Sequence, residues 1–273
     1  LTVADIRGTS AKVWNAWKGK LLEDLFWATR RYMMGGKIAD QVGEVRQRSM
    51  ETLSLYAIAP EVYKLLWAQL DADYFLRHEP HEIAWHVRQL AHRVNSPEAI
   101  VKARLSRIGE GIQILVYSPD QPYLFARICN FFARMNYNIM EAKIHTTQHG
   151  YALDSFLVMD AGNDKTIYRD VMNFIEYELA QQLASPQLPK APKAGRISRQ
   201  LKHFPITPQV DIRQDEKGNH QLSIIAGDRP GLLAHIAHAL AHHHIEVRSA
   251  KINTLGARAE DTFWIAGAAL KQP

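Results

Sequence analysis

Two stretches of this 273-residue chain repeat one pattern, Asp120-Gln-Pro-Tyr-Leu-Phe-Ala126 and Asp228-Arg-Pro-Gly-Leu-Leu-Ala234. They lie 108 residues apart, and further identities surround them at nearly the same spacing. Ala142-Lys-Ile144 matches Ala250-Lys-Ile252, and Asp154-Ser-Phe156 matches Asp261-Thr-Phe263 after a slip of one residue. Repeated identities at one spacing indicate two copies of one supersecondary unit, which we call the first and the second repeat.

The residue spacing around the first stretch predicts the secondary structure of the first repeat. Alternating and helical patterns predict strands over residues 112–116, 139–147 and 151–159, a helix over 124–135, and a second helix after Asp164. Residues 204–213 hold two prolines, as an edge strand tolerates, and could supply a last strand. The first repeat then has the order βαββαβ.

The second repeat follows the same order as far as the sequence runs. We expect strands over 221–226, 245–254 and 258–266 and a helix over 230–243, after which the sequence ends at Pro273. This leaves no room for a second helix and a last strand, so the second repeat is predicted to be truncated. The first residue is Leu1 rather than Met, and we expect a piece of a longer protein.

The remaining sequence completes a four-part organisation of α+β class. Residues 1–105 are expected to be mostly helical, because two sets of residues follow helical spacing typical of core side chains: Trp14, Trp17, Leu21, Leu25 and Ala28, and later Ala84, Val87, Leu90 and Val94. The first repeat is assigned to 106–184, with its last strand at 204–213. A linker covers 185–203, and the second repeat covers 204–273.

The net charge of +5 has a local origin. Residues 185–202 hold five Lys or Arg, no Asp or Glu, and three prolines, so their excess equals the net charge of the whole chain. Proline stiffens a linker and like charges extend it. Contact with an acidic partner or a nucleic acid is the alternative, but no aromatic residues alternate with these charges, which favours a solvated linker. No apolar stretch approaches the ~20 residues of a membrane helix, so no membrane partner is expected and the cytoplasm is the expected location.

The repeated Asp-x-Pro turn sits between the first strand and the first helix, where unpaired backbone N–H groups favour an anion such as a carboxylate. Gly231 lets a ligand approach the backbone of the second turn, whereas Tyr123 places a ring at the matching position of the first. The second turn is therefore the expected ligand site: Asp228, Arg229, Pro230, Gly231, Leu232 and Leu233. The first is expected to be the weaker site: Asp120, Gln121, Pro122, Tyr123 and Leu124.

The repeated unit, with Asp228-Arg-Pro-Gly-Leu-Leu233, resembles the ACT domain, a regulatory module that binds amino acids, usually between paired copies. The resemblance implies a ferredoxin-like βαββαβ fold for both repeats. It also implies a ligand held between residues 228–233 and a facing strand of another ACT unit, and self-association through these domains. Tyr123 departs from the glycine that the ACT pattern has at this position.

Further motifs resemble the C-terminal part of the family of bifunctional uridylyltransferase/uridylyl-removing enzymes. They are Leu1-Thr-Val-Ala-Asp-Ile-Arg7, Trp14-Asn-Ala-Trp-Lys18, Ser118-Pro-Asp-Gln-Pro-Tyr-Leu-Phe-Ala126 and Glu260-Asp-Thr-Phe-Trp264. The resemblance implies a bacterial nitrogen sensor that adds UMP to the PII signal protein when glutamine is scarce and removes it when glutamine is plentiful. Its ligand would be glutamine. An ACT module of another amino-acid-controlled metabolic enzyme is the alternative.

The same resemblance implies a nucleotidyltransferase domain and an HD-type phosphohydrolase domain, with Mg²⁺ or Mn²⁺, ahead of ACT domains that need no cofactor. Asp5, preceded by Ala, matches the last metal ligand of an HD site, although it could equally end a helix. The chain has no His-Asp pair for the rest of that site and no Gly-Ser pair for nucleotidyl transfer. These 273 residues alone are therefore expected to catalyse neither reaction.

Three other groups of side chains invite a chemical role, and each has a simpler explanation. Asp71 and Asp73 imitate an acidic metal pair but are expected at a helix end. His235, His238 and His242 share one helix stripe, which is expected to be its solvated face. Cys129 lies among apolar residues and is expected to be a buried thiol rather than a nucleophile.

Overall fold

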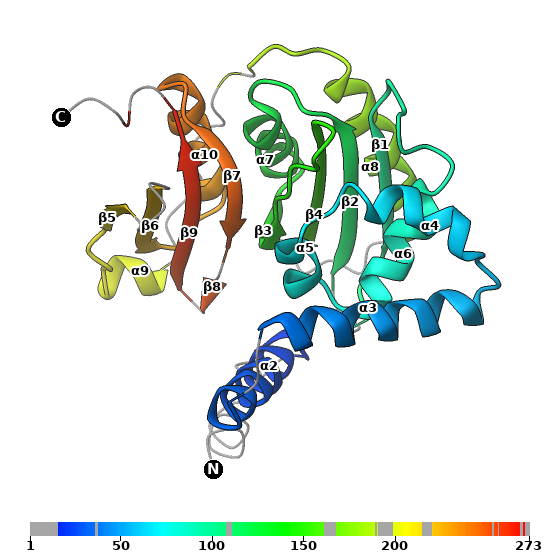
Figure 1. The fold of residues 1–273 in the computed structure, drawn as a ribbon. Coiled ribbons are helices and arrows are strands. Elements are labelled where there is room, and N and C mark those ends of the chain that lie inside the picture. Colours follow the sequence, from blue (N-terminus) through cyan, green and yellow to red (C-terminus); the bar gives the residue numbers. More distant parts are fainter. Residues whose placement is uncertain are drawn as a thin grey trace. The chain divides into compact units, whose positions relative to one another are not determined.

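The computed structural model describes residues 16–35, 38–107, 111–160, 168–188, 190, 199–214, 220–252, 254–255, 257–267 and 270 (Figure 1). Asp5, Trp14 and Asp164 lie outside these residues. The described chain falls into two compact units: the residues up to His92 together with 105–107 form the first, and the remaining described residues form the second. The first holds helices and the second holds two antiparallel sheets, which confirms the predicted α+β class.

Five helices form the first compact unit within its described residues: α2 (Ala16–Met33), α3 (Ile38–Leu55), α4 (Pro60–Trp67), α5 (Ala72–Arg77) and α6 (Pro80–Leu90). Proline at the first position of α4 and of α6 suits a helix start, because the N–H that it lacks would have no partner there. Asp71 caps α5 by accepting a hydrogen bond from the backbone N–H of Tyr74 at 3.1 Å. Its helix-end role is thereby confirmed.

The core of the helical unit is built mainly around α6. Ala84, Val87 and Leu90 are buried, as their spacing predicts. The stripe predicted on α2 behaves differently, because Leu25 is 62% exposed and Ala28 is exposed as well. The prediction of a core stripe is therefore wrong at these two residues: helical spacing reports an apolar face, not what covers it.

The second compact unit contains both repeats. The first repeat consists of β1 (Ile100–Leu105), β2 (Ile112–Pro119), α7 (Leu124–Arg134), β3 (Tyr137–Lys143), β4 (Tyr151–Asp160) and α8 (Tyr168–Leu183). The second consists of α9 (Arg199–His203), β5 (Gln209–Gln214), β6 (His220–Gly227), α10 (Leu232–His242), β7 (Glu246–Lys251), β8 (Thr254–Leu255) and β9 (Arg258–Ala266). The sheet orders correspond, β1-β2-β4-β3 and β5-β6-β9-β7, with the short β8 also paired to β9.

The two repeats agree closely in structure. β2 and α7 lie 108 residues before β6 and α10 at both of their ends. The register of β3 on β4 shifts between Ile139 and Glu141, and that of β7 on β9 shifts at the matching place, between Val247 and Ser249. A shared irregularity of this kind confirms the predicted duplication, because bulges depend on local sequence and are kept within related folds.

The prediction that residues 204–213 supply the last strand of the first repeat is wrong. β5 pairs with β6 of the second repeat, and β1 takes the corresponding edge of the first sheet. Each edge strand thus precedes the strand it pairs with, so only a short loop has to close. β1 was hidden inside residues 1–105, which were expected to be mostly helical.

The second repeat accordingly lacks a helix and not a strand within the described residues. In the first repeat, α8 covers β1: Glu176 accepts a hydrogen bond from the backbone N–H of Ala103 at 2.8 Å and pairs with Lys102 Nζ at 2.6 Å. No described element follows β9, and β5 is exposed along its length. Val210 of β5 is 66% exposed, whereas Val101 of β1 is 4% exposed.

This difference predicts opposite effects of one substitution at two related valines. Val101→Asp should destabilise the protein by more than about 3 kcal/mol, because it buries an unpaired charge. Val210→Asp should change stability by less than about 0.5 kcal/mol, because the side chain remains in water. Urea unfolding followed by circular dichroism measures both values. Equal losses would contradict the uncovered state of β5.

One hydrophobic core joins the two repeats. α7 packs against α10, β3 lies next to β7, and the rings of Phe125 and Phe263 are 6.2 Å apart. The end of the predicted linker also packs: Leu201 of α9 is buried, and a Cβ on Gly227 would come within 2.8 Å of it. Residues 199–203 are therefore not a solvated linker, because their leucine finds an apolar contact on the second repeat.

Candidate functional site

The two Asp-x-Pro turns end in the same backbone conformation. Tyr123 and Gly231 stand directly before α7 and α10 in the left-handed region, with φ of 64° and 80°. Glycine adopts this conformation freely, whereas another residue there costs about 1–3 kcal/mol. Each turn is tied to its own repeat, because Asp120 N–H donates to Gly150 O at 2.9 Å and Asp228 N–H donates to Ala257 O at 2.8 Å.

A pocket of about 40 Å³ lies beside the second turn. The second repeat lines it with Asp228, Arg229, Gly231, Leu232, Leu233, Ala234, Ile252, Thr254, Ala259 and Asp261. The first repeat lines it with Cys129 and Ala133 of α7 and Tyr137, Asn138 and Ile139 of β3. All residues predicted for the second site except Pro230 lie in this lining, and β3 is the facing strand. This volume accommodates about three water molecules, so a free amino acid has to widen the pocket or extend out of it.

The chemistry of the lining is mixed in a specific way. The start of α10 and the Arg229 side chain provide positive charge or N–H donors, while Asp228 and Asp261 provide carboxylates. The carboxamide of Asn138 can both donate and accept hydrogen bonds. Such a lining suits a small molecule that carries both a negative and a positive group, with a polar uncharged group between apolar walls.

Comparison with known proteins agrees with this geometry. The family model of the ACT domain matches residues 112–176 and 220–267, and that of the fifth domain of uridylyltransferase GlnD matches residues 37–89. The chain is 57% identical to the bifunctional uridylyltransferase/uridylyl-removing enzyme of Chromobacterium violaceum and 52% identical to that of Aromatoleum aromaticum, over 99% and 100% of this chain and 32% of each relative. The chain belongs to this enzyme family. It spans about a third of the length of these curated relatives. No solved structure matches the chain significantly.

The two repeats are thus ACT domains, and the turn of the first ACT domain is held differently. Gln121 Nε2 donates to Leu183 O at 3.2 Å, and the buried Arg127 donates to Gln121 Oε1 at 2.8 Å and to Gln182 O at 2.7 Å. Burial lowers the pKa of the Arg127 guanidinium. Gln121 is therefore occupied in fastening its own turn to the end of α8.

The strand facing the first turn also differs. At the spacing of 108, Asn138 of β3 corresponds to Glu246 of β7. The pKa of Asp120 is raised, mainly by burial and further by the Glu246 carboxylate, while the Asp120 hydrogen bond with the Gln121 backbone and the charge of Arg248 lower it. Glu246 replaces the carboxamide of Asn138 here, and the Tyr123 ring stands where the second turn has Gly231, so this place is less suited to a ligand than the pocket beside Gly231.

Burial also raises the pKa of Asp228, and a hydrogen bond from the backbone N–H of Arg229 lowers it by a smaller amount. A carboxyl whose pKa is higher in the folded state stabilises the fold when protonated, and this contribution is lost as the pH rises through the folded pKa. Asp228→Asn should therefore raise the unfolding temperature relative to the unsubstituted protein at pH 7. The difference should shrink as the pH falls toward the ordinary value of 3.8.

Thermal unfolding of both proteins across this pH range measures that difference. Other groups titrate alike in the two proteins, so the comparison isolates position 228. If the difference in unfolding temperature stayed constant down to pH 3, the charge of Asp228 would not be its cause.

Several lining residues were not predicted from the sequence, among them Cys129, Asn138 and Asp261. The sequence patterns assign no role to Asn138, because its place opposite Gly231 depends on how the two ACT domains pack. Asp261 was noted as a repeated identity with Asp154 and given no role. The spacing of 108 would have paired Asn138 with Glu246 and so distinguished the two sites.

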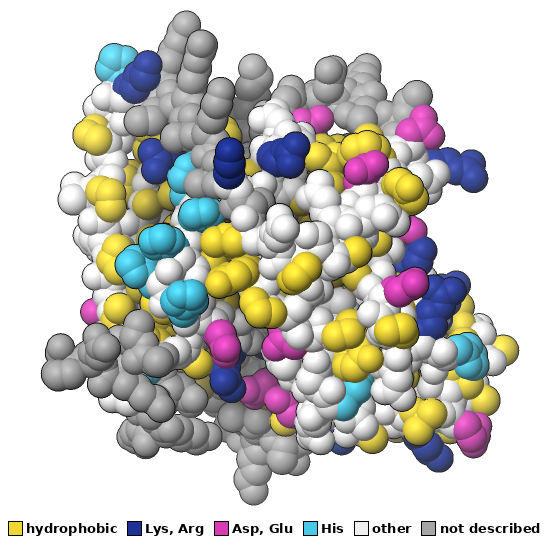
Figure 2. Space-filling model, turned by 90° about the horizontal axis from the view of Figure 1, so that it is seen from above, with side chains coloured by type: hydrophobic (Ala, Val, Ile, Leu, Met, Phe, Trp, Pro, Cys, Tyr) yellow, Lys and Arg dark blue, Asp and Glu magenta, His cyan; other side chains and the backbone are white. Residues whose placement is uncertain are grey.

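The other candidates have structural explanations. His235 Nδ1 is 2.8 Å from Gly231 O, and Figure 2 shows several histidines close together on the face seen from above. Among the described residues, no group of three or more His, Cys, Asp or Glu could hold a metal ion. Cys129 is buried, as expected, and its pKa is raised mainly by burial and further by Asp154 and Asp261.

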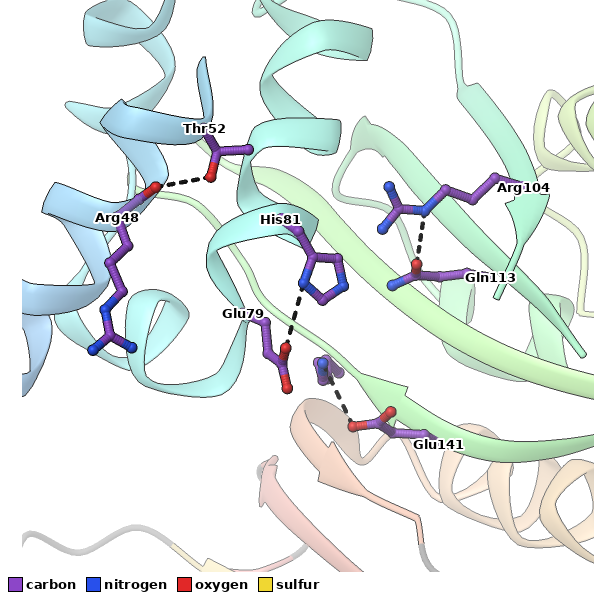
Figure 3. A network of polar contacts seen from close by, with 8 residues as sticks. Arg48, Thr52, Glu79, His81, Arg104, Gln113 and Glu141 are labelled. Atoms are coloured by element: carbon purple, nitrogen blue, oxygen red, sulfur yellow. Dashed lines mark hydrogen bonds and ion pairs between the residues drawn. The ribbon is translucent and has the colours of Figure 1, made fainter. Parts of the chain in front are cut away.

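Some polar contacts outside the pocket stabilise a single element or a pair of strands. Figure 3 shows Arg104 Nε of β1 donating to Gln113 Oε1 of β2 at 2.8 Å, and His81 beside Glu79 at 3.3 Å near the start of α6. Arg213 of β5 lies opposite Gln221 of β6 in the second ACT domain, so the similarity of the two domains includes an Arg and a Gln at corresponding places of their edge strands and the adjacent strands.

Within the described part of the chain, none of the helices combines the length and apolar character needed to cross a membrane.

Proposed function

We propose that this chain is the regulatory part of a cytoplasmic enzyme that uridylylates and deuridylylates the PII signal protein, and that glutamine binds between its two ACT domains. The observation that carries the proposal is the pocket shared by the turn at Gly231 and by β3. Relatives about half identical to the chain are named for the two opposing reactions, which need a signal to choose between them.

Two polar groups of glutamine are proposed to have complementary partners in this pocket. The α-carboxylate is proposed to lie at the start of α10, where Gly231 has no side chain to obstruct it. The side-chain amide is proposed to pair with the carboxamide of Asn138, which can satisfy both its donor and its acceptor. A coupling of only about 1–3 kcal/mol between this site and the catalytic domains would shift the balance of the two reactions.

Catalysis itself is proposed to belong to other domains of the parent protein, with Mg²⁺ or Mn²⁺. Asp5 is proposed as the last ligand of the HD-type metal site there. The 273 residues alone are proposed to be inactive, so incubation with PII and UTP should give no uridylylated PII. Transfer of UMP by this chain would contradict the assignment.

Isothermal titration of the chain with each of the twenty amino acids tests the glutamine proposal. We expect L-glutamine to bind at one site per chain and more tightly than L-glutamate, whose side-chain carboxylate can only accept hydrogen bonds from Asn138 and adds a negative charge to a pocket that already holds two carboxylates. Tighter binding of another amino acid would favour the alternative, an ACT module of a different amino-acid-controlled enzyme. Absence of binding by any of them would overturn both.

A further inference from the structure

Asp261 is a buried carboxylate in the wall of the pocket. It lies on β9 opposite Ile224 and is 3% exposed. Its counterpart in the first ACT domain, Asp154 on β4, is 1% exposed and does not line this pocket. A buried carboxylate is costly unless charged or hydrogen-bonding groups compensate it, so the presence of both needs an explanation.

Asp154 shows the structural part of that explanation. Its Oδ1 accepts a hydrogen bond from the backbone N–H of His145 at 3.2 Å and so ties β4 to the chain that follows β3. Asp261 occupies the matching position, where a corresponding role in the second ACT domain is expected. Unlike Asp154, Asp261 also lines the pocket, where Asp228 is the second carboxylate.

The charges of the lining indicate what these carboxylates could bind. Asp228 and Asp261 carry two formal negative charges, and Arg229 carries one positive charge. A purely anionic metabolite would have to approach both carboxylates, whereas a zwitterion offers them an ammonium group and leaves its carboxylate for the start of α10. Charge-assisted hydrogen bonds of this kind are stronger than neutral ones.

We propose that Asp261, together with Asp228, receives the α-ammonium group of the ligand and thereby restricts the site to amino acids over their deaminated counterparts. The proposal rests on the proposed function, because it names the group of glutamine that this wall recognises. Asp261 is a specificity-determining residue in this account, and Asp154 is structural only.

Two ligands distinguish recognition from structural support: L-glutamine and glutaramic acid, which is the same molecule without the α-amino group. Both are titrated into the unsubstituted chain, into Asp261→Asn and into the matched control Asp154→Asn. The asparagine keeps an oxygen that can accept the structural hydrogen bond, while it removes the charge.

The unsubstituted chain should bind glutamine at least about 10-fold more tightly than glutaramic acid. Asp261→Asn should weaken glutamine binding by about 10- to 100-fold, the range of a charge-assisted hydrogen bond, and leave glutaramic acid binding unchanged or tighter. Asp154→Asn should preserve the preference for glutamine. Circular dichroism and thermal unfolding of each variant establish that it is folded.

An equal loss of both ligands in Asp261→Asn would overturn the proposal, because a merely structural residue supports any ligand alike. A preference below about 3-fold in the unsubstituted chain would overturn it whether or not the variant folds. Failure of the proposed function looks different: the unsubstituted chain would then bind another amino acid in place of glutamine, and the same comparison, made with that amino acid and its deaminated form, would still decide the role of Asp261.

Discussion

Replacement of Gly231 by tyrosine should weaken glutamine binding by at least about 100-fold, equivalent to about 2.7 kcal/mol. The side chain would start in the wall of the pocket, at the first residue before α10, and would fill the space that the ligand needs. The backbone conformation does not forbid the change, since Tyr123 stands at the matching position with φ of 64°. The variant should therefore fold, and titration calorimetry measures the loss.

The matched control is Tyr123→Gly, which alters the first turn only. It should leave the affinity for glutamine within about threefold of the original, because Tyr123 does not line the pocket beside Gly231. Binding of a second glutamine in this control would show that the Tyr123 ring alone closes the first site. Unchanged glutamine binding by Gly231→Tyr would show that the second turn is not part of the binding site.

Replacement of Phe263 by alanine should destabilise the protein by about 3–5 kcal/mol, the range for a fully buried aromatic side chain. Phe263 is 0% exposed on β9, where it belongs to the core that joins the two ACT domains. Its loss removes apolar contacts on β9 and the ring contact with Phe125. Urea unfolding monitored by tryptophan fluorescence and by circular dichroism gives the change.

Phe174→Ala provides the comparison for this core substitution. Phe174 of α8 is 50% exposed, so its removal should cost less than about 1 kcal/mol. Phe263→Leu should fall between the two, because leucine refills part of the volume. A loss at Phe174 as large as that at Phe263 would contradict the placement of the core.

The duplicated fold was predictable because the signals that specify it are local. The alternation in β2 and the helical spacing in α7 lie within about twenty-five residues, and the second repeat presents both again. The edge strands were assigned wrongly because a local sequence pattern does not specify the strand with which an edge strand pairs. The sequence of residues 204–213 indicates a strand but not its partner, and the structure forms the strand over 209–214 and pairs it with β6.

For a similar reason, only the wall of the pocket that belongs to the second ACT domain could be predicted from the sequence. The turn at Gly231 is predicted by the glycine itself and by the Asp-x-Pro pattern before a helix. Asn138 lies about ninety residues earlier in the other ACT domain, and no local pattern marks it as the opposite wall. Its position follows from the packing of α7 against α10, which depends on how the two apolar faces fit.

Because residues of both ACT domains line the pocket, a ligand bound in it contacts both domains at once. Separation of the two domains would break the ligand's contacts with one of them, so the binding free energy of the ligand adds to the free energy needed to separate them. At a ligand concentration one hundred times Kd, that addition is about 2.7 kcal/mol. A bound ligand would then strengthen the association of the two ACT domains as its concentration rises, without a change in the structure of either domain.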